Sequence, residues 1–558
     1  MKLRMRSHME INGKKMVTAA LALTLAASML LLGACGSGST SDSAASETGE
    51  GAVTADTVSD SDTLIVSYSA DTGDLNPHTY NSPMWVQSLV YEGLTRFVDG
   101  EVVGGIAESW EISEDGLTYV FHLDEDNVFS DGTPVNAQIV KKNFDAVLAN
   151  AERHDWMETY QVLESVDVID DYTVQLNLSA PFSGLLQELA LSRPVRIGAE
   201  AMFPESGDTS EEIAEPIGSG PWKLVEHVDS QYALFERNEN YHGTVPSYKY
   251  LKVLIIPDIN TAANALKAGE IDMIYDVESQ MTGDTYNELV SSGFAAEISD
   301  PVTTNMILLN TNSGATADKN VRLAIEYAID KQSIADNVYG GIQPVADYLM
   351  NPETPYCDIP ELTTYDYDPD KAAELLDEAG WVLEDGQSVR TKDGEALSIR
   401  FLYEGDNDSV KVMGEVIQAQ LLKVGINVEL VPQDATNYGT SQKEGLFELL
   451  QAETWGDPFD PHSYMSSFRV TTHGDYAAQL GLEEKAQIDE AITEAINAVD
   501  EEVAAENYKY VLTTLTDEAV YVPVTYTTKA YIYNAEAVAD VSYNTYLDIP
   551  YETFTLTK

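Results

Sequence analysis

The sequence AESWEISEDGLTYVFHL, at residues 107–123, contains a turn and the strand that follows it. Tyr119–Leu123 alternates in side-chain character, as a half-buried strand does. Glu114-Asp115-Gly116 before it and Asp131-Gly132 after it are turn sequences. Ala137–Leu148 follows with apolar residues at helical spacing. The stretch therefore predicts strand and helix in alternation, which is typical of an α/β fold.

Outward from this stretch, the same alternation continues over about 500 residues. That length exceeds the ~250–300 residues at which a single core stops growing, so we expect two or three domains. The pattern predicts helices at Pro83–Leu94, Ala262–Ala268, Lys319–Tyr339, Pro369–Ala379, Val410–Val424 and Glu483–Leu515, the last broken near Asp500. It predicts strands at Thr63–Ser69, Ile271–Tyr275, Ser398–Leu402, Ile426–Leu430, Val520–Tyr526 and Ala530–Tyr533, and a hairpin at Arg390–Leu397.

The N-terminus has the pattern of an export signal. Met16–Leu32 is apolar over about 17 residues, short of the ~20 that span a bilayer, and ends at Leu32-Gly33-Ala34-Cys35. We expect residues 1–35 to be a lipoprotein signal peptide that leaves Cys35 lipid-modified on the outer face of the cell membrane; an uncleaved anchor is the alternative. Residues 36–61 have few large apolar side chains and predict a disordered tether.

Composition excludes several functions. The net charge of -62 repels phosphate backbones, so we expect no nucleic-acid partner and membrane contact only through the lipid. Because Cys35 is used for the lipid, Cys357 has no other cysteine with which to form an intrachain disulfide. The sequence has no nucleotide-binding glycine loop, zinc-protease helix or nucleophile elbow, and no histidines spaced as a metal pair. These absences predict a protein that is not an enzyme and has no intrinsic cofactor.

Short motifs across residues 62–558 carry a resemblance to a known family. They are 107–123, Phe129–Pro134, Pro216–Trp222, Arg237–Tyr241, Gly269–Asp272 and Ala379–Trp381. In this order they resemble the extracytoplasmic solute-binding proteins, family 5, of peptide and nickel ABC importers. The resemblance implies a two-lobed periplasmic-binding-protein-like fold of type II, large peptide/nickel-binding class, with a hinge between the lobes and the ligand in the interlobe cleft.

The resemblance also implies domain limits and partners. Lobe I would contain residues 62–302 and 527–558, with an inserted subdomain at roughly 96–215, and lobe II would contain residues 303–526. The chain would therefore cross between lobes twice. The partners would be a small-molecule ligand and the membrane permease of the importer, which supplies the energy coupling that this chain lacks.

Within the family, the nickel-importer proteins are the most similar. The segments Leu75–His78 with Tyr80, Arg153–Trp156, Arg193–Arg196 and Trp455–His462 look like their ligand-facing segments. The resemblance implies that His473 is the one protein ligand to Ni(II), which would arrive as a small-molecule chelate because one imidazole supplies only one of the four to six donors nickel needs. It implies ligand contacts from Tyr80, Met84, Arg153, Trp156, Arg193, Trp455, Asp457 and Phe459.

Each of these roles has a structural alternative. Arg153 and Arg193 would pair bidentately with chelator carboxylates, but arginines more often form surface or structural ion pairs. The tryptophans suit a hydrophobic core, and Thr471, Thr472 and Gly474 around His473 suit a solvated loop. If the role is structural in each case, the nickel interpretation fails while the family remains.

The sequence departs from the nickel pattern at three places, and one of them keeps a second ligand class open. Phe459 stands where the nickel pattern has tyrosine, the spacing from Tyr80 to Met84 is one residue short, and Asp457 stands where the pattern has a small apolar residue. Peptide-binding members use an aspartate in this segment to bind the α-amino group of the peptide, so a di- or oligopeptide ligand is the alternative function. An enzyme or a surface adhesin is a third class. Turnover assays would identify an enzyme, and a protein partner with no small ligand in the cleft would identify an adhesin.

Overall fold

The structure is a computed structural model that describes residues 53–558, apart from 56, 99–100, 277–279, 302, 456–460 and 544–548. The predicted signal peptide and Cys35 lie outside these residues, as do Asp457 and Phe459. Among the described residues, no helix is both long and apolar enough to cross a bilayer.

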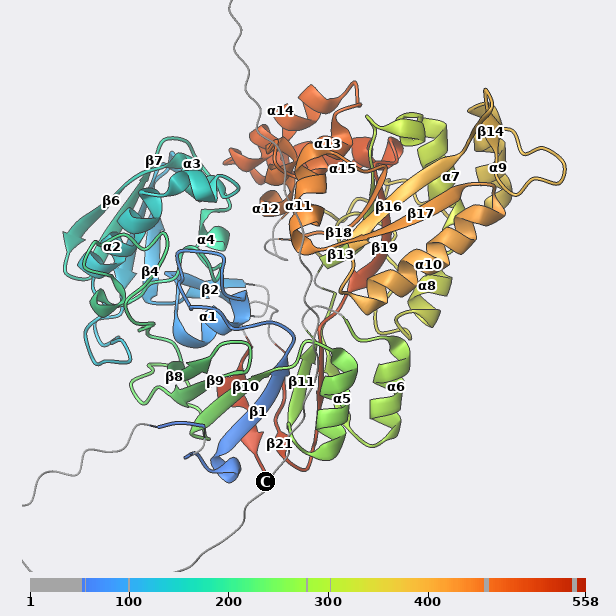
Figure 1. The fold of residues 1–558 in the computed structure, drawn as a ribbon. Helices are drawn as coiled ribbons and strands as arrows, with labels where there is room; N and C mark the ends of the chain where they lie inside the picture. The colour runs from blue at the N-terminus through green and yellow to red at the C-terminus, as the bar shows by residue number, and fades with distance from the viewer. Residues whose placement is uncertain are drawn as a thin grey trace, which may run out of the picture. The chain divides into compact units, whose positions relative to one another are not determined.

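A seven-stranded sheet forms the base of the first lobe (Figure 1). Its central strand β1 (Thr63–Tyr68) pairs in parallel with β10 (Tyr250–Ile255) and β11 (Met273–Asp276). The remaining strands are β8 (Trp222–Val228), β9 (Tyr232–Arg237), β12 (Ala295–Ile298) and β20 (Ala530–Tyr533). Apolar residues of α5 (Ile259–Ala268) and α6 (Gly283–Ser291) pack with those of β11 and β20 in one core cluster.

The stretch at residues 107–123 belongs to a separate four-stranded antiparallel sheet. The sheet has the order β4 (Ala107–Ile112), β5 (Thr118–Leu123), β7 (Thr173–Leu178) and β6 (Leu163–Asp170). Tyr119, Phe121 and Leu123 of β5 are buried while the residues between them are partly exposed, which confirms the predicted alternating strand. The predicted helix is also confirmed as α2 (Ala137–Leu148), which packs against β6 and β7.

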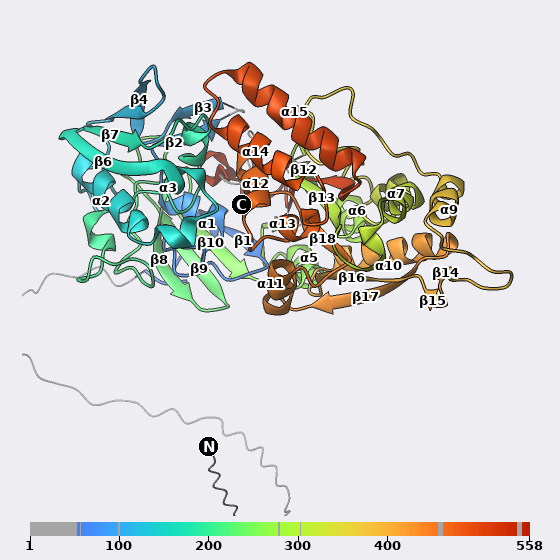
Figure 2. The ribbon, with the colours of Figure 1, turned by 90° about the horizontal axis from the view of Figure 1, so that it is seen from above.

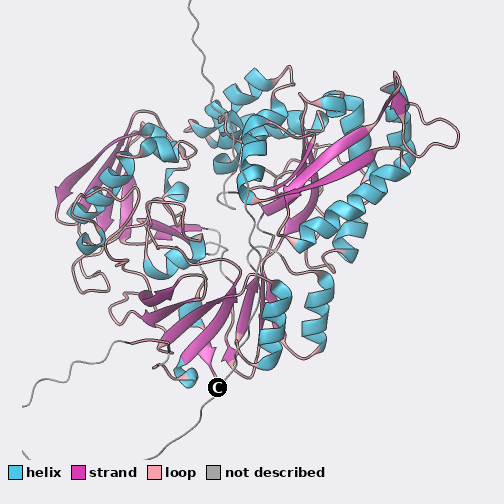
Figure 3. Cartoon of the chain, viewed as in Figure 1, coloured by secondary structure: helices cyan, strands magenta, loops and turns pink. Residues whose placement is uncertain are grey.

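A five-stranded sheet forms the second lobe. Its order is β17 (Asn427–Gln433), β16 (Ser398–Glu404), β18 (Leu449–Glu453), β13 (Thr303–Leu309) and β19 (Tyr521–Thr527). The first three strands run parallel, and β13 is antiparallel to both its neighbours. Helices α7 (Lys319–Ala328), α9 (Pro369–Glu378) and α10 (Asp408–Lys423) share a hydrophobic core with this sheet. Figure 3 shows these helices beside its strands.

The chain passes twice between the two large sheets. It leaves the seven-stranded sheet between β12 and β13 and returns between β19 and β20. The connecting segments touch, because the Ser299 N–H donates to the Lys529 carbonyl (2.9 Å) and the Lys529 N–H donates to Ser299 Oγ (2.8 Å). The mixed α/β fold and its two lobes agree with the expectation; the residue limits given for the lobes and the inserted subdomain stay predictions.

A helical layer lies between the four-stranded and five-stranded sheets (Figure 2). It consists of α11 (Ala435–Glu444), α12 (His462–Ser466), α13 (Gly474–Gln479), α14 (Lys485–Ile496) and α15 (Glu501–Asp517). Ile488 and Leu512 of this layer are buried in the same core cluster as Phe182 and Leu185 of the first lobe. The helical layer therefore shares a hydrophobic core with the first lobe.

Short elements complete the chain. The α-helices among them are α1 (Met84–Val90), α3 (Glu158–Val162), α4 (Leu185–Glu188) and α8 (Lys331–Asn337). The strands are β2 (Thr95–Val98), β3 (Glu101–Gly104), β14 (Thr391–Lys392), β15 (Glu395–Ala396), β21 (Val538–Ala539) and β22 (Thr555–Leu556). Within the described residues, 3-10 helices lie at Asp60–Asp62, Ala151–His154, Glu200–Met202, Gly314–Ala317, Ser467–Arg469 and Tyr551–Thr553.

Two predicted helices differ from the structure. The helix expected at Lys319–Tyr339 is divided into α7 and α8, because the Asp330 side chain accepts a hydrogen bond from the Ser333 N–H and caps a new helix. The helix expected at Pro83–Leu94 is shorter in the structure, where it is α1 and ends at Val90. The Val90 carbonyl accepts a hydrogen bond from the Gly220 N–H.

Candidate ligand-binding site

Five of the predicted site residues form a continuous row of ring contacts. The Arg193 guanidinium lies 5.4 Å from the centroid of the Tyr80 ring, and Tyr80 lies 6.2 Å from Trp156. Trp156 meets Trp455 edge to face with centroids 5.3 Å apart. Trp455 in turn stacks on His473 with centroids 5.7 Å apart and the planes 28° from parallel. We call these five residues the aromatic row; it has a cation at one end and an imidazole at the other.

A chain of hydrogen bonds fixes the position of Tyr80. Trp156 Nε1 donates to the Tyr80 hydroxyl (2.7 Å), and this hydroxyl lies 2.6 Å from His154 Nδ1. Because the indole only donates, the hydroxyl proton of Tyr80 goes to His154 Nδ1. Burial, and after it the charge of Arg153, lowers the pKa of His154 to about 4, so His154 is neutral and accepts. Burial also raises the pKa of the Tyr80 phenol, which stays protonated.

Arg193 is held against the loop that contains Tyr80. Its Nη1 donates to the carbonyl of Tyr80 at 3.0 Å and also to the carbonyl of Ser82. The side chain is partly buried, and its charge acts on the Tyr80 phenol. These contacts orient the guanidinium relative to the aromatic row.

Arg153 and Met84 do not join the row by any ring contact or hydrogen bond among the described residues. Arg153 is exposed, and its Nη1 donates to the Ser210 carbonyl at 2.8 Å. Its positive charge is still close enough to act on Tyr80 and His154. Met84 is the first residue of α1 and packs, partly buried, against the main hydrophobic core.

His473 is placed by the helix that follows it. It is the N-cap residue of α13, and its backbone N–H donates to the Val470 carbonyl at 3.0 Å. Burial lowers the pKa of the imidazole, against the smaller opposing influence of Asp475 and Asp155. Within the described part of the chain, neither ring nitrogen has a hydrogen-bond partner. His473 is therefore neutral at pH 7, and one ring nitrogen has the lone pair that a metal ion requires.

Two residues that the sequence did not identify support the row. His154 orients Tyr80 as described above; its only signal in the sequence was its place between Arg153 and Trp156. Asp475 is buried and accepts from the hydroxyls of Tyr464 (2.6 Å) and Tyr521 (3.0 Å), which fixes the start of α13 below His473. No local pattern marks Asp475, because its partners lie on α12 and β19.

Polar contacts join the two sides of the row, and one of them is fully buried. His462 Nε2 lies 3.2 Å from Glu188 Oε1, with the two side chains 2% and 0% exposed. Glu188 also accepts from the Thr159 N–H at 2.9 Å. Nearby, Arg469 forms an ion pair with Glu158 at 3.0 Å. Helix α12 is therefore docked on α4, and the 3-10 helix that follows it, Ser467–Arg469, is docked on α3. Ser466 Oγ of α12 also donates to the Trp156 carbonyl at 3.3 Å.

The protein comparisons agree with this architecture. Residues 101–476 match the family described as bacterial extracellular solute-binding proteins, family 5 Middle. The nickel-binding periplasmic protein of Escherichia coli (strain K12) is 39% identical over 468 residues, which cover 83% of this chain and 89% of that protein. The dipeptide-binding protein of the same organism is 27% identical and covers 73% of this chain and 78% of its own length.

A solved structure gives the same result. NikA from Brucella suis, crystallised in complex with Fe(III)-EDTA, is 42% identical and superposes with a TM-score of 0.86, covering 88% of this chain and 99% of that chain. The family match spans more than half of the chain, and the fold and two-lobed architecture are the same. The chain belongs to family 5 of the bacterial extracellular solute-binding proteins.

Proposed function

We propose that the chain captures nickel as a small-molecule chelate against the aromatic row and delivers it to the permease of an ABC importer. The observation that carries the proposal is the row itself. It joins Tyr80, Trp156 and Arg193 to Trp455 and His473, which come from chain segments on opposite sides of the first crossing between the sheets. The nickel-binding protein of E. coli and NikA of B. suis support a metal chelate as the ligand class.

In the proposed complex, both the protein and the chelator supply donor atoms to the metal. His473 gives one nitrogen to the metal, and the chelator supplies the remaining donors. Arg193 and Arg153 receive chelator carboxylates, which a guanidinium binds bidentately at every relevant pH. The rings of Tyr80, Trp156 and Trp455 exclude water, so that each charge contact is stronger than in bulk solvent. Met84 and Phe459 would complete the apolar wall.

We further propose that the protein is attached to the outer face of the membrane through a lipid on Cys35. The signal-like sequence before this cysteine supports the assignment. Labelling of cells with a palmitate analogue is expected to tag the wild-type protein and to leave Cys35→Ser untagged and released from the membrane fraction. Equal labelling of both proteins would exclude lipidation at this cysteine.

A peptide is the second candidate ligand. Asp457 and the similarity to the E. coli dipeptide-binding protein favour it. In this function the Asp457 carboxylate would pair with the α-amino group of a di- or oligopeptide, and no metal would be needed.

Calorimetry separates the two functions. The mature protein is titrated with nickel(II)–EDTA, with nickel(II)–L-histidine and, after metal removal, with a di- and tripeptide library. We expect a nickel complex to bind with 1:1 stoichiometry and the peptides to give no heat. Tight peptide binding without metal, lost in Asp457→Asn and unchanged in His473→Ala, would reject the nickel function in favour of the peptide function.

A further inference from the structure

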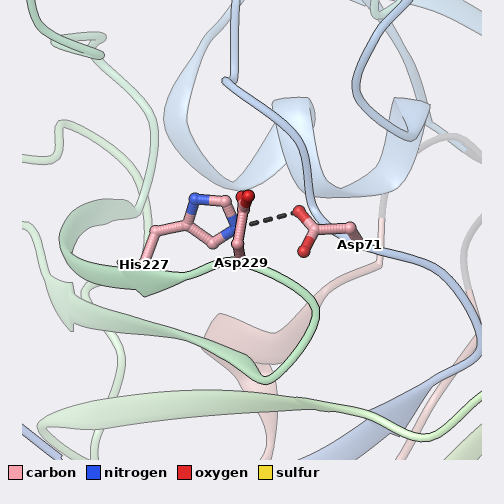
Figure 4. A group of neighbouring side chains, drawn as sticks. All are labelled: Asp71, His227 and Asp229. Carbon is pink, nitrogen blue, oxygen red and sulfur yellow. Dashed lines mark hydrogen bonds and ion pairs between the residues drawn. The ribbon is translucent and has the colours of Figure 1, made fainter. Parts of the chain in front are cut away.

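Three metal-ligating side chains converge away from the aromatic row (Figure 4). Asp71 lies in the loop after β1, His227 lies on β8, and Asp229 lies in the turn between β8 and β9. One donor atom of each residue lies within 4.8 Å of the other two. In Figure 4 both carboxylates lie at the same edge of the His227 ring, the edge of Nε2.

The spacing suits direct coordination. Asp71 Oδ1 and His227 Nε2 are 2.8 Å apart. Two ligands each ~2.1 Å from a transition-metal ion are about 3–3.5 Å apart in octahedral or tetrahedral geometry, so this pair would have to move apart by only a small distance. The ion would replace the hydrogen bond between the two atoms, with the imidazole proton on Nδ1 and the Nε2 lone pair directed at the ion. Asp229 is the donor that must approach, and its side chain is exposed on the turn between β8 and β9.

The protein already orients the Asp71 carboxylate. Its Oδ1 accepts from the Gly73 N–H at 2.8 Å, and its Oδ2 accepts from the Ser230 N–H. Hydrogen bonds of this kind behind a ligand fix its orientation and strengthen metal binding. The Ser230 bond also places the turn that contains Asp229 next to Asp71, so the three donors come from two segments that are already joined.

We propose that Asp71, His227 and Asp229 form a second metal site, which binds a bare divalent first-row transition ion without a chelator. One imidazole and two carboxylates suit zinc or nickel, with water completing the coordination. The site lies on the first lobe alone and is independent of the function proposed for the aromatic row. A bound ion would tie the β8–β9 hairpin to the loop that runs from Asp71 to Tyr80.

The test uses calorimetry and thermal melting of the mature protein with ZnCl2 and, separately, NiCl2. Two variants remove one ligand each: His227→Gln, whose amide still donates to Asp71, and Asp229→Asn, which changes an exposed side chain. His122→Gln is the matched control, because His122 also faces a carboxylate, Glu111, at 4.0 Å but forms no three-residue cluster with it among the described residues.

We expect one ion per wild-type chain, at least tenfold weaker binding in His227→Gln and in Asp229→Asn, and wild-type binding in His122→Gln. The increase in melting temperature with ZnCl2 should disappear in the same two variants, whose melting without metal should match the wild type. Failure of the wild type to bind either ion would overturn the proposal. The cluster would then serve only to join the loop and the turn by hydrogen bonds. Wild-type affinity in both variants would also overturn it, because the ion would then bind elsewhere.

Discussion

At the scale of the residue, burial decides the protonation of two histidines of the candidate site. His473 is partly buried against Trp455, and desolvation lowers its pKa. His154 is buried beneath Tyr80 for the same reason and stays neutral, with a pKa of about 4. Both imidazoles are therefore in the neutral form that accepts a hydrogen bond or coordinates a metal at pH 7.

The pKa of His473 gives a prediction about pH. A proton competes with the metal for the imidazole, and the lowered pKa moves this competition to more acidic solution. We expect the affinity for the nickel complex to be constant from pH 8 to about 6.5, the ordinary pKa of histidine, and to fall only below it. His473→Ala should bind at least tenfold more weakly at pH 7.5 and lose this pH dependence.

Titration calorimetry between pH 5 and 8, in buffers that do not bind nickel, measures both effects. His122→Gln serves as the control for a surface histidine. A fall in affinity already between pH 8 and 7, or a pH profile unchanged in His473→Ala, would show that another group binds the metal.

His242 makes the stability of the folded protein depend on pH, and its contribution is largest at low pH. The hydrogen bond with Glu92, 2.9 Å long, raises the pKa of His242 in the folded protein. The pair therefore stabilises the fold below the unfolded pKa of about 6.5, and this contribution is lost as pH rises through the folded pKa. We expect His242→Gln to lower the free energy of unfolding by about 1–2 kcal/mol at pH 5.5 and by much less at pH 9. Urea unfolding at the two pH values tests this; an equal loss at both would contradict it.

At the scale of the element, the contact between α4 and α12 depends on a glycine. Gly184, the residue before α4, lies under the His462 ring of α12, and a Cβ added there would be 2.5 Å from His462 Cε1. No larger residue fits without moving the ring away from Glu188. Gly439 within α11 has no atom within 4 Å of an added Cβ.

Two alanine substitutions therefore have opposite expected effects. Gly184→Ala should destabilise by about 1–3 kcal/mol because the packed, buried ring must shift. Gly439→Ala should stabilise by about 0.5–1 kcal/mol, because alanine favours the helix and nothing obstructs it. Urea unfolding of the two variants beside the wild type measures both effects. A Gly184→Ala variant as stable as the wild type would contradict the close α4–α12 contact, and a destabilised Gly439→Ala variant would contradict the open surface of α11.

At the scale of the whole molecule, binding and stability are linked. A ligand that contacts residues on both sides of the crossings stabilises the folded protein and adds about 2.7 kcal/mol at one hundred times its dissociation constant. We expect the nickel complex to raise the melting temperature of the wild type by several degrees and to raise that of His473→Ala much less at the same concentration. Scanning calorimetry measures this, and an equal increase in both proteins would place the complex away from His473.

Local sequence determined most of the elements. The alternation of Tyr119–Leu123 and the helical spacing of Ala137–Leu148 predicted β5 and α2, and Pro369 and Gly380 predicted the limits of α9 to within a residue. These features depend on neighbours a few residues away, so they are visible in the sequence. The division of Lys319–Tyr339 into two helices was missed because an aspartate cap competes with a continuous apolar pattern.

The sequence by itself therefore determined the α/β class, the family motifs and the residue types suited to an anionic metal complex. Only the tertiary structure decided which of those residues meet. Tyr80, Trp156 and Arg193 reach Trp455 and His473 because two crossings between sheets and the docking of α12 on α4 bring distant segments together. Sheet order and such docking arise from packing between residues far apart in the chain, which no local pattern encodes.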